Sequence, residues 1–380
     1  MTSNDVVGVV VNSLQCRRTL LELAAEFGLR EDPNLRHSLR ADEAELVSHV
    51  VKILDSKAQE TVVLSLVGNA AQSFIDVVQD ILDRGSVLER TQGKKARRII
   101  RKLSEACDKL PSALFVTGVS GCPTHPTFGG GFGDVYCASH GGKAVALKVM
   151  RHFSESAESR NIRLNICREA LVWRGLHHPH ILPFIGIDRD TFPSLAIVSP
   201  WMEQGTVLNH LDRHGRADVD KLLFQIAQGI GYLHSRNIVH GDLRGANILV
   251  NDNWTACLAD FGLSNFTDPI STASSTKRAG SLYWMAPELL DPNRYGRKFV
   301  RTPATDVYAF GCVCVELYTG RPPLSDLPGP AVIFPILNGE RAPRPMGPPT
   351  MSDTLWQNVT NYWAADPEAR PSSDIMTQQM

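Results

Sequence analysis

The segment from Ile238 to Leu263, IVHGDLRGANILVNDNWTACLADFGL, constrains this chain more than any other part of its sequence. It carries two carboxylates and one amide, those of Asp242, Asn247 and Asp260, at spacings of five and thirteen residues. If the residues between Asn247 and Asp260 form a hairpin, the three side chains converge on one site. Oxygen ligands of this kind suit a hard cation such as Mg2+. The segment therefore predicts a site for a magnesium-bound triphosphate.

The runs D-L-R-G-A-N from Asp242 and D-F-G from Asp260 resemble the catalytic segments of the eukaryotic protein kinase family. A lone Asp would more often form a turn or a helix cap, but the two runs together favour catalysis. The resemblance implies that Asp242 orients the substrate hydroxyl and accepts its proton, and that Asn247 and Asp260 bind Mg2+. It places Arg244 in the same catalytic loop.

A second run, FGGGFGDVY from Phe128 to Tyr136, resembles the glycine-rich loop that covers the nucleotide phosphates between two antiparallel strands. Glycines allow backbone N–H groups to approach phosphates closely. Phe128 occupies the position of the first loop glycine, so we expect altered loop mobility with nucleotide binding retained. The resemblance assigns ATP binding in this loop to Gly130, Gly131, Phe132 and Gly133.

A lysine and a glutamate complete the expected phosphate site. Val145-Ala146-Leu147-Lys148 begins twelve residues after Gly133 and reads as a buried strand. By resemblance, Lys148 holds the α- and β-phosphates. Its expected partner is Glu169, nine residues before His178, on a helix of the small lobe. Most helical glutamates lie on the surface, so this ion pair is a prediction.

The adenine ring is expected between two sets of residues. An apolar strand runs into Ser199 at the family's gatekeeper position, where a small side chain leaves room behind the nucleotide. The resemblance implies that Pro200, Trp201 and Met202 form the hinge and that Val135, Ala146 and Leu249 sandwich the adenine. By type the three apolar residues around the adenine are ordinary core residues, and only their register in the family pattern singles them out.

The C-terminal part carries further family features. The stretch from Asn265 to Leu290 resembles an activation segment that contains A-P-E. By resemblance, Asp306 ties the catalytic loop to a central helix, and Arg370 pairs with Glu288. Both roles are structural.

Two features of the sequence indicate whether the acceptor is a Ser/Thr or a Tyr hydroxyl, and they disagree. Arg244 stands where Ser/Thr kinases usually have Lys, as in some tyrosine kinases. Gly280-Ser281-Leu282 before Y-W-M-A-P-E instead resembles the tyrosine-kinase-like Ser/Thr group. We favour Ser/Thr phosphorylation, with tyrosine or dual specificity as an alternative.

The catalytic loop reads His240-Gly241-Asp242, where most regulated kinases have His-Arg-Asp. Glycine cannot make the bidentate contact to a phosphorylated activation loop. We therefore hypothesise that activation does not depend on phosphorylation read through that arginine, despite six hydroxyl residues in the segment: Thr267, Ser271, Thr272, Ser274, Ser275 and Thr276.

Composition sets further bounds. The 380 residues suffice for a two-lobed domain and one small module. Lys and Arg number 39 against 40 Asp and Glu, which implies no general attraction to nucleic acid or membranes. The 8 cysteines are scattered, which favours free thiols in a reducing compartment and an intracellular, cytoplasmic protein. We find no segment long and apolar enough to span a membrane.

The chain is expected to have an α+β, bilobal kinase-like fold preceded by a small all-α module. Residues 1–110 show helical periodicity, 111–126 read as a linker, and 127–380 as the catalytic domain. The small β-rich N-lobe would cover about 112–199, the hinge 200–203 and the larger helical C-lobe 204–380. The order of these parts also resembles kinase-like proteins of mushroom-forming fungi.

Four helices are expected in the first 110 residues, at about 4–27, 41–57, 61–84 and 94–109. The clearest apolar stripe is Ala71, Phe74, Ile75, Val78, Ile81 and Leu82. The basic stretch from Gly93 to Leu110 is interpreted as a solvated helix face, with a nuclear-import or acidic-partner patch as the alternative.

Two functions remain open from the sequence. The first is an active protein kinase that uses ATP and Mg2+, acts on a protein substrate, and has an N-terminal module that binds a partner or regulates. The second is a pseudokinase scaffold. Pseudokinases commonly lack at least one catalytic residue, so the presence of all five favours the first: Lys148, Glu169, Asp242, Asn247 and Asp260.

Overall fold

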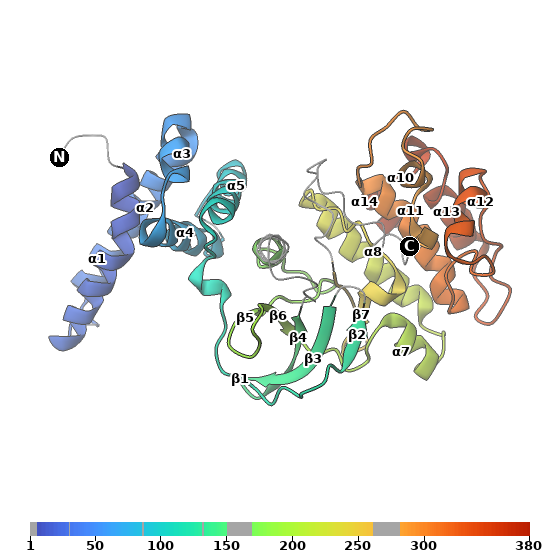
Figure 1. Cartoon of the computed structure of the whole chain (residues 1–380), viewed down its shortest axis with the longest axis horizontal. Helices are drawn as coiled ribbons and strands as arrows, with labels where there is room; N and C mark the ends of the chain where they lie inside the picture. Colours follow the sequence, from blue (N-terminus) through green and yellow to red (C-terminus); the bar gives the residue numbers. More distant parts are fainter. Residues whose placement is uncertain (1–5, 30, 86, 131–132, 150–168, 261–281) are drawn as a thin grey trace. The chain divides into compact units, whose positions relative to one another are not determined.

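The computed structural model describes residues 6–29, 31–85, 87–130, 133–149, 169–260 and 282–380 (Figure 1). The chain divides into two compact units. The first comprises Met1–Val119, His152–Gly175 and Gly186–Ile197. The second comprises Ser120–Arg151, Leu176–Ile185 and Val198–Met380.

The first unit begins with helices, coloured blue to teal in Figure 1. They are α1 (Val6–Glu26), α2 (Pro33–Asp55), α3 (Lys57–Leu64), α4 (Gly68–Asp83) and α5 (Arg90–Cys107). The apolar stripe predicted on α4 faces a shared core that also contains Val10, Ile53 and Leu103. Burial of these faces stabilises the module, because short helices are marginal alone in water.

The predicted helix over 61–84 is wrong in one respect, because the structure divides this stretch into α3 and α4. Ser65 ends α3, and Gly68 begins α4 with a φ of +58°. Such a φ is accessible to glycine but strained for other residues. Apolar periodicity continues across the break, so the pattern alone does not reveal it.

Three of the basic residues of α5 are paired with acids of the module. Lys95 contacts Asp55 at 2.6 Å, and Arg98 and Lys102 each contact Glu60 at 3.0 Å. Asp55 ends α2 and Glu60 belongs to α3. These ion pairs favour the interpretation of this stretch as a solvated helix face.

The residues that follow α5, up to Val119, belong to the first unit. They form a 3-10 turn, η1 (Ser112–Leu114), and then an extended stretch whose Val116 N–H donates to Ile187 O at 3.0 Å. Ile187 lies in β5 (Gly186–Asp188). The backbones approach so closely that a Cβ on Gly186 would lie 2.4 Å from Val116 Cγ1. Strand β1 (Val119–Ser120) follows.

The second unit contains an antiparallel sheet. Strand β2 (Phe128–Gly130) pairs with β3 (Gly133–His140), which pairs with β4 (Lys143–Val149). Gly141 and Gly142 join β3 to β4 with φ values of +58° and +75°, as a two-residue hairpin turn requires. Next to β4 in the sheet lies β6 (Ala196–Pro200), and Trp201 N–H donates to Ala144 O at 3.1 Å.

The rest of the second unit is mainly helical. Helix α8 (Val219–Ser235) packs against α11 (Pro303–Thr319), α14 (Ser373–Gln379) and the strand β8 (Ala256–Leu258). Residues 305–318 of α11 are all buried, so this helix forms the core of the region. The other helices are α7 (Val207–His214), α10 (Pro287–Leu290), α12 (Ile333–Leu337) and α13 (Asp353–Tyr362).

Short elements complete the fold: the strands β7 (Ile248–Val250) and β8 (Ala256–Leu258), and the 3-10 turns η2 (Gly245–Asn247), η3 (Leu282–Trp284), η4 (Gly329–Val332) and η5 (Pro367–Ala369). Within the described ranges, no helix has the length and apolar character that crossing a membrane requires.

Candidate active site

The β7–β8 hairpin brings two candidate metal ligands to the same end. Leu249 pairs with Cys257, and Ile248 with Leu258. Asn247 precedes β7 and Asp260 follows β8, and the backbone N–H of Ala259 donates to Asn247 O at 2.9 Å. The hairpin predicted between the two motifs is therefore confirmed.

Asp242 and Asn247 contact each other directly. Asn247 Nδ2 donates to Asp242 O at 2.7 Å and to Asp242 Oδ2 at 2.9 Å, and Asn247 is 4% exposed. Because the amide nitrogen makes both bonds, a cation would be held by the amide oxygen. The second of these bonds orients the Asp242 carboxylate, which also lies 3.5 Å from Arg244 Nε.

Lys148 of β4 forms an ion pair and hydrogen bond with Asp260. Burial by itself would raise the pKa of Asp260, but the charge and hydrogen bond of Lys148 outweigh it and lower the pKa. The carboxylate is thus held ionised. Asp260 has a φ of +57°, and strained backbone at non-glycine residues clusters at functional sites.

The catalytic loop is tied to α11 by Asp306, as the resemblance implied. Its carboxylate accepts from the backbone N–H groups of His240 at 2.7 Å and Gly241 at 2.8 Å, and lies 2.8 Å from His234 Nε2. Asp306 is 1% exposed. Burial lowers the pKa of His240 despite the nearby carboxylates, which favours a neutral imidazole there.

The sheet register places the expected nucleotide-facing residues on one face. Val135 lies opposite Lys148, and Cys137 opposite Ala146. Because side chains alternate along a strand, these four residues share a face. They are half-buried, whereas Val145 and Leu147 of β4 are buried on the other face. Leu249 is likewise half-buried between two buried neighbours in β7.

The expected hinge has an aromatic contact that the sequence did not suggest. Ser199 and Met202 are buried, and Pro200 and Trp201 are half-buried. The Trp201 ring stacks on Phe128 of β2, with ring centroids 5.9 Å apart and an interplanar angle of 19°. The residue that replaces the first loop glycine thus contacts the hinge.

Two buried acids hold the segment around A-P-E. Glu288 forms a bidentate ion pair with Arg370 at 2.7 and 2.8 Å, which confirms the predicted pair. Glu316 was missed. Its Oε2 accepts from Gly245 N at 2.8 Å and from Trp284 Nε1 at 2.9 Å, so it links the catalytic loop to η3. The signal available was a single carboxylate inside the apolar run of α11.

Some predicted residues are not tested. Gly131, Phe132, the six hydroxyl residues of the activation segment, and Gly280 and Ser281 lie outside the described residues. Glu169 is described and is 4% exposed, but it belongs to the first compact unit, whereas Lys148 belongs to the second. Their ion pair remains a prediction. Gly130 and Gly133 lie at the adjoining ends of β2 and β3.

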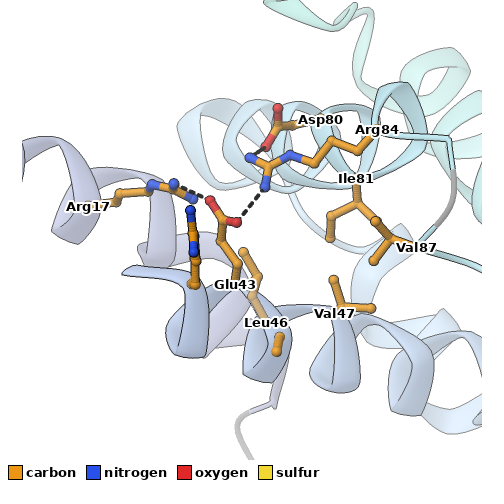
Figure 2. A pocket seen from close by; sticks show the side chains of 10 residues that line it. Arg17, Glu43, Leu46, Val47, Asp80, Ile81, Arg84 and Val87 are labelled. Atoms are coloured by element: carbon orange, nitrogen blue, oxygen red, sulfur yellow. Dashed lines mark hydrogen bonds and ion pairs between the residues drawn. The ribbon is translucent and has the colours of Figure 1, made fainter. Parts of the chain in front are cut away.

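A separate cavity of about 230 Å³ lies in the helical module (Figure 2). Glu43 of α2 lines it and binds Arg17 and, at 2.9 Å, Arg84, which also contacts Asp80 at 2.6 Å. Burial would raise the pKa of Glu43, but the two arginines lower it overall. The cavity is lined by three arginines, Arg17, Arg40 and Arg84, and two acids, Glu43 and Asp80, so its lining carries one more positive than negative side chain.

The donor set fits magnesium bound together with a nucleotide. In the residues that the structure covers, no three His, Cys, Asp or Glu side chains gather into a metal site. Asp260 and Asn247 provide one carboxylate and one amide at one end of the hairpin. Mg2+ is commonly held by one or two carboxylates, with phosphates and water completing the octahedron.

The chain is similar to known protein kinases. A family model described as protein tyrosine and serine/threonine kinase matches residues 127–380. Mitogen-activated protein kinase kinase kinase 3 of Arabidopsis thaliana is 32% identical over 259 residues, which cover 66% of this chain and 40% of that protein. Serine/threonine-protein kinase STY46 of the same plant is 30% identical over 263 residues, covering 67% and 43%.

A third relative, serine/threonine-protein kinase CTR1 of Arabidopsis thaliana, is 32% identical over 251 residues, which cover 64% of this chain and 29% of that protein. The chain thus matches less than half of the length of each of these relatives. The expected fold class is confirmed: an all-α segment precedes a β-rich part and a helical part.

Proposed function

Because the chain belongs to the protein tyrosine and serine/threonine kinase family, we propose that it transfers the γ-phosphoryl group of Mg-ATP to a hydroxyl of a protein substrate. The Asp242–Asn247 contact beside the Lys148–Asp260 pair carries this proposal. We assign residues 127–380 to the catalytic domain, 1–110 to the helical module and 111–126 to the connection between them.

Asp242 has the role of orienting the substrate hydroxyl and accepting its proton. One bond from Asn247 and the nearby Arg244 hold its carboxylate, and a second bond from Asn247 holds its backbone carbonyl. Positioning and charge stabilisation dominate phosphoryl transfer, because the transition state is loose and its charge spreads over the phosphoryl oxygens. A carboxylate fixed in this way therefore serves the reaction without further covalent chemistry.

Lys148, Asp260 and Asn247 bind the nucleotide and its metal in this proposal. Mg2+ supplies charge neutralisation at the phosphates when bound. Lys148 holds the α- and β-phosphates, and Glu169 orients Lys148. Asp260 and Asn247 hold the ion. The half-buried face of Val135 and Ala146, together with Leu249, accommodates the adenine, and the 199–202 segment forms its edge.

The preferred acceptor is a serine or threonine hydroxyl. Two of the relatives described above are named serine/threonine-protein kinases. The run from Gly280 to Leu282 supports the same class, whereas Arg244 is the residue that suits a tyrosine kinase. Phosphoamino-acid analysis of a phosphorylated peptide library separates the two, because a product containing phosphotyrosine alone contradicts the proposed class.

The central experiment compares radiolabelled phosphate transfer by the wild type with transfer by Asp242→Ala. We expect transfer by the wild type and at least about a thousandfold loss in the variant. Asp252→Ala, at an exposed residue in the β7–β8 turn, is the matched control and should remain active. Nucleotide binding without transfer by the wild type would instead support a pseudokinase scaffold.

We further propose that activation is not read through an arginine beside Asp242. Gly241 occupies that position and has no side chain to bind a phosphate. Replacing the six hydroxyl residues of the activation segment by Ala should therefore change kcat less than about threefold. A loss of activity similar to that of Asp242→Ala would contradict this part of the proposal.

A further inference from the structure

The N-terminal module contacts the segment that carries Glu169 through an ion pair and a hydrogen bond. Asp83, the last residue of α4, forms a bidentate ion pair with Arg174. Arg174 Nε lies 3.0 Å from Asp83 Oδ1, and its second terminal nitrogen lies 2.7 Å from Oδ2. The side chains are 24% and 32% exposed, so solvent screens the pair only in part. Bidentate geometry also fixes orientation.

The same guanidinium is held from a second side. Arg174 donates to Ala113 O at 2.6 Å, in the turn that follows α5. That turn is itself fixed on α4, since Asp76 accepts from Ser112 N at 2.6 Å and from Ser112 Oγ at 2.9 Å. Gln72 of α4 donates to Leu110 O at 2.7 Å. Arg174 thus contacts a preformed surface.

An apolar contact lies on the same helical face. Residues 169–173 are helical, and Arg174 N–H donates to Ala170 O at 2.9 Å, so the turn continues through Arg174. Leu171 packs against the core of the module. Leu171 and Arg174 are three residues apart and therefore lie on one face of the helix. Both contacts attach this face to α4 and its neighbours.

Glu169 is on the opposite side of this helix from Leu171. Two residues correspond to a rotation of about 200° in an α-helix with 3.6 residues per turn. Fixing Leu171 and Arg174 on the module therefore sets the rotation of the helix, and with it the direction of the Glu169 carboxylate.

We propose that the N-terminal helical module positions Glu169, with Asp83 and Arg174 as the positioning residues. The inference rests on the proposed function, in which Glu169 orients Lys148. It gives residues 1–110 a regulatory role: a ligand or partner that disturbs the Asp83–Arg174 contact would change the rate of phosphoryl transfer.

The test is a set of charge variants in the full chain. Asp83→Arg should lower kcat at saturating ATP at least about fivefold, because two guanidinium groups repel each other. The exchanged pair Asp83→Arg with Arg174→Asp should recover part of the loss, although the bond to Ala113 is not restored. Asp55→Lys with Lys95→Asp, an exposed ion pair of the same module, is the control and should keep wild-type kcat.

A second background separates positioning from general destabilisation. If Asp83 acts through Glu169, Asp83→Arg should have no further effect on kcat in a Glu169→Gln chain. An equal fivefold loss in both backgrounds would overturn the proposal, as would an unchanged kcat in Asp83→Arg alone.

Hydrogen exchange distinguishes this inference from the proposed function if the wild type transfers no phosphate. Asp83→Arg should then accelerate amide exchange in residues 169–175 at least about tenfold, while α1 and α2 exchange at wild-type rates. Unchanged exchange in 169–175 would overturn the inference, whatever the activity of the chain.

Discussion

Asp306 on α11 accepts a hydrogen bond at 2.8 Å from the backbone N–H of Gly241, the residue before Asp242. The same carboxylate accepts from His240 N at 2.7 Å. A helix within the core therefore sets the path of the catalytic loop. These two bonds fix the backbone directly before Asp242, so the position of Asp242 depends on Asp306.

Asp306→Asn should damage both stability and activity. An amide has one acceptor oxygen in place of two, so a buried backbone N–H loses its partner at a cost of about 2–3 kcal/mol. We expect kcat to fall at least about tenfold, because a shift of the loop moves the Asp242 carboxylate out of its working position. Urea unfolding and kcat measure the two effects. Asp326→Asn, at a side chain that is 92% exposed, should change neither.

Gly241→Arg should destabilise the protein without making it dependent on phosphorylation. Gly241 has a φ of +76°, and this conformation costs an L-residue about 1–2 kcal/mol. Gly241→Ala should show the same loss of stability, since the strain comes from the backbone. The control is Gly347→Ala, where the backbone is unstrained and an added Cβ meets open space. Equal stability of Gly241→Ala and wild type would contradict the prediction.

Glu316→Gln should remove a pH dependence of stability. Burial raises the pKa of Glu316 to about 7, against 4.5 for the ordinary side chain. Between these pH values the folded protein binds more protons than the unfolded chain, so Glu316 lowers stability as pH rises. Titration of Glu316 should therefore lower the free energy of unfolding by about 3 kcal/mol across this pH range.

Glutamine keeps an acceptor oxygen for Gly245 and Trp284 but does not titrate. Urea unfolding of both proteins at pH 4.5 and pH 8 isolates the effect from other groups. The stability of the wild type relative to Glu316→Gln should fall over this range. A constant difference between the two proteins would show that Glu316 titrates normally.

Phe128→Gly should weaken nucleotide binding. The stack on Trp201 is worth about 0.5–1.5 kcal/mol, and its loss frees β2 beside the glycine-rich loop. We expect KM for ATP to rise about two- to tenfold, with faster nucleotide dissociation. Adding Trp201→Ala to Phe128→Gly should not raise KM by the same factor a second time, because the stacking contact is already lost in the single variant. Phe334→Ala, at an exposed phenylalanine of α12, provides the control.

Local spacing made the geometry of the candidate catalytic centre predictable. Asp242 and Asn247 are five residues apart and meet through a single loop and turn. Asn247 and Asp260 lie at the same end of a short hairpin whose two apolar strands are visible in the sequence. Such contacts depend on few backbone angles, so the residue types and their spacing determine most of the geometry.

Helical periodicity predicted the module but not its internal break. The apolar stripe of α4 is buried as expected, because periodicity reports which face is covered. The change of chain direction at Gly68 leaves no mark in that pattern. It follows from one glycine with a positive φ.

The sequence by itself predicted the candidate catalytic residues, the family and the amphipathic faces of the helices. Only the tertiary structure decided which distant partners those elements have. Asp83 and Arg174 are 91 positions apart, and Gly245 and Glu316 are 71 apart. Apolar patterning specifies that a face must be covered, but not by which element, because burial of apolar area is not directional. The choice of partner depends on the packing of the whole chain.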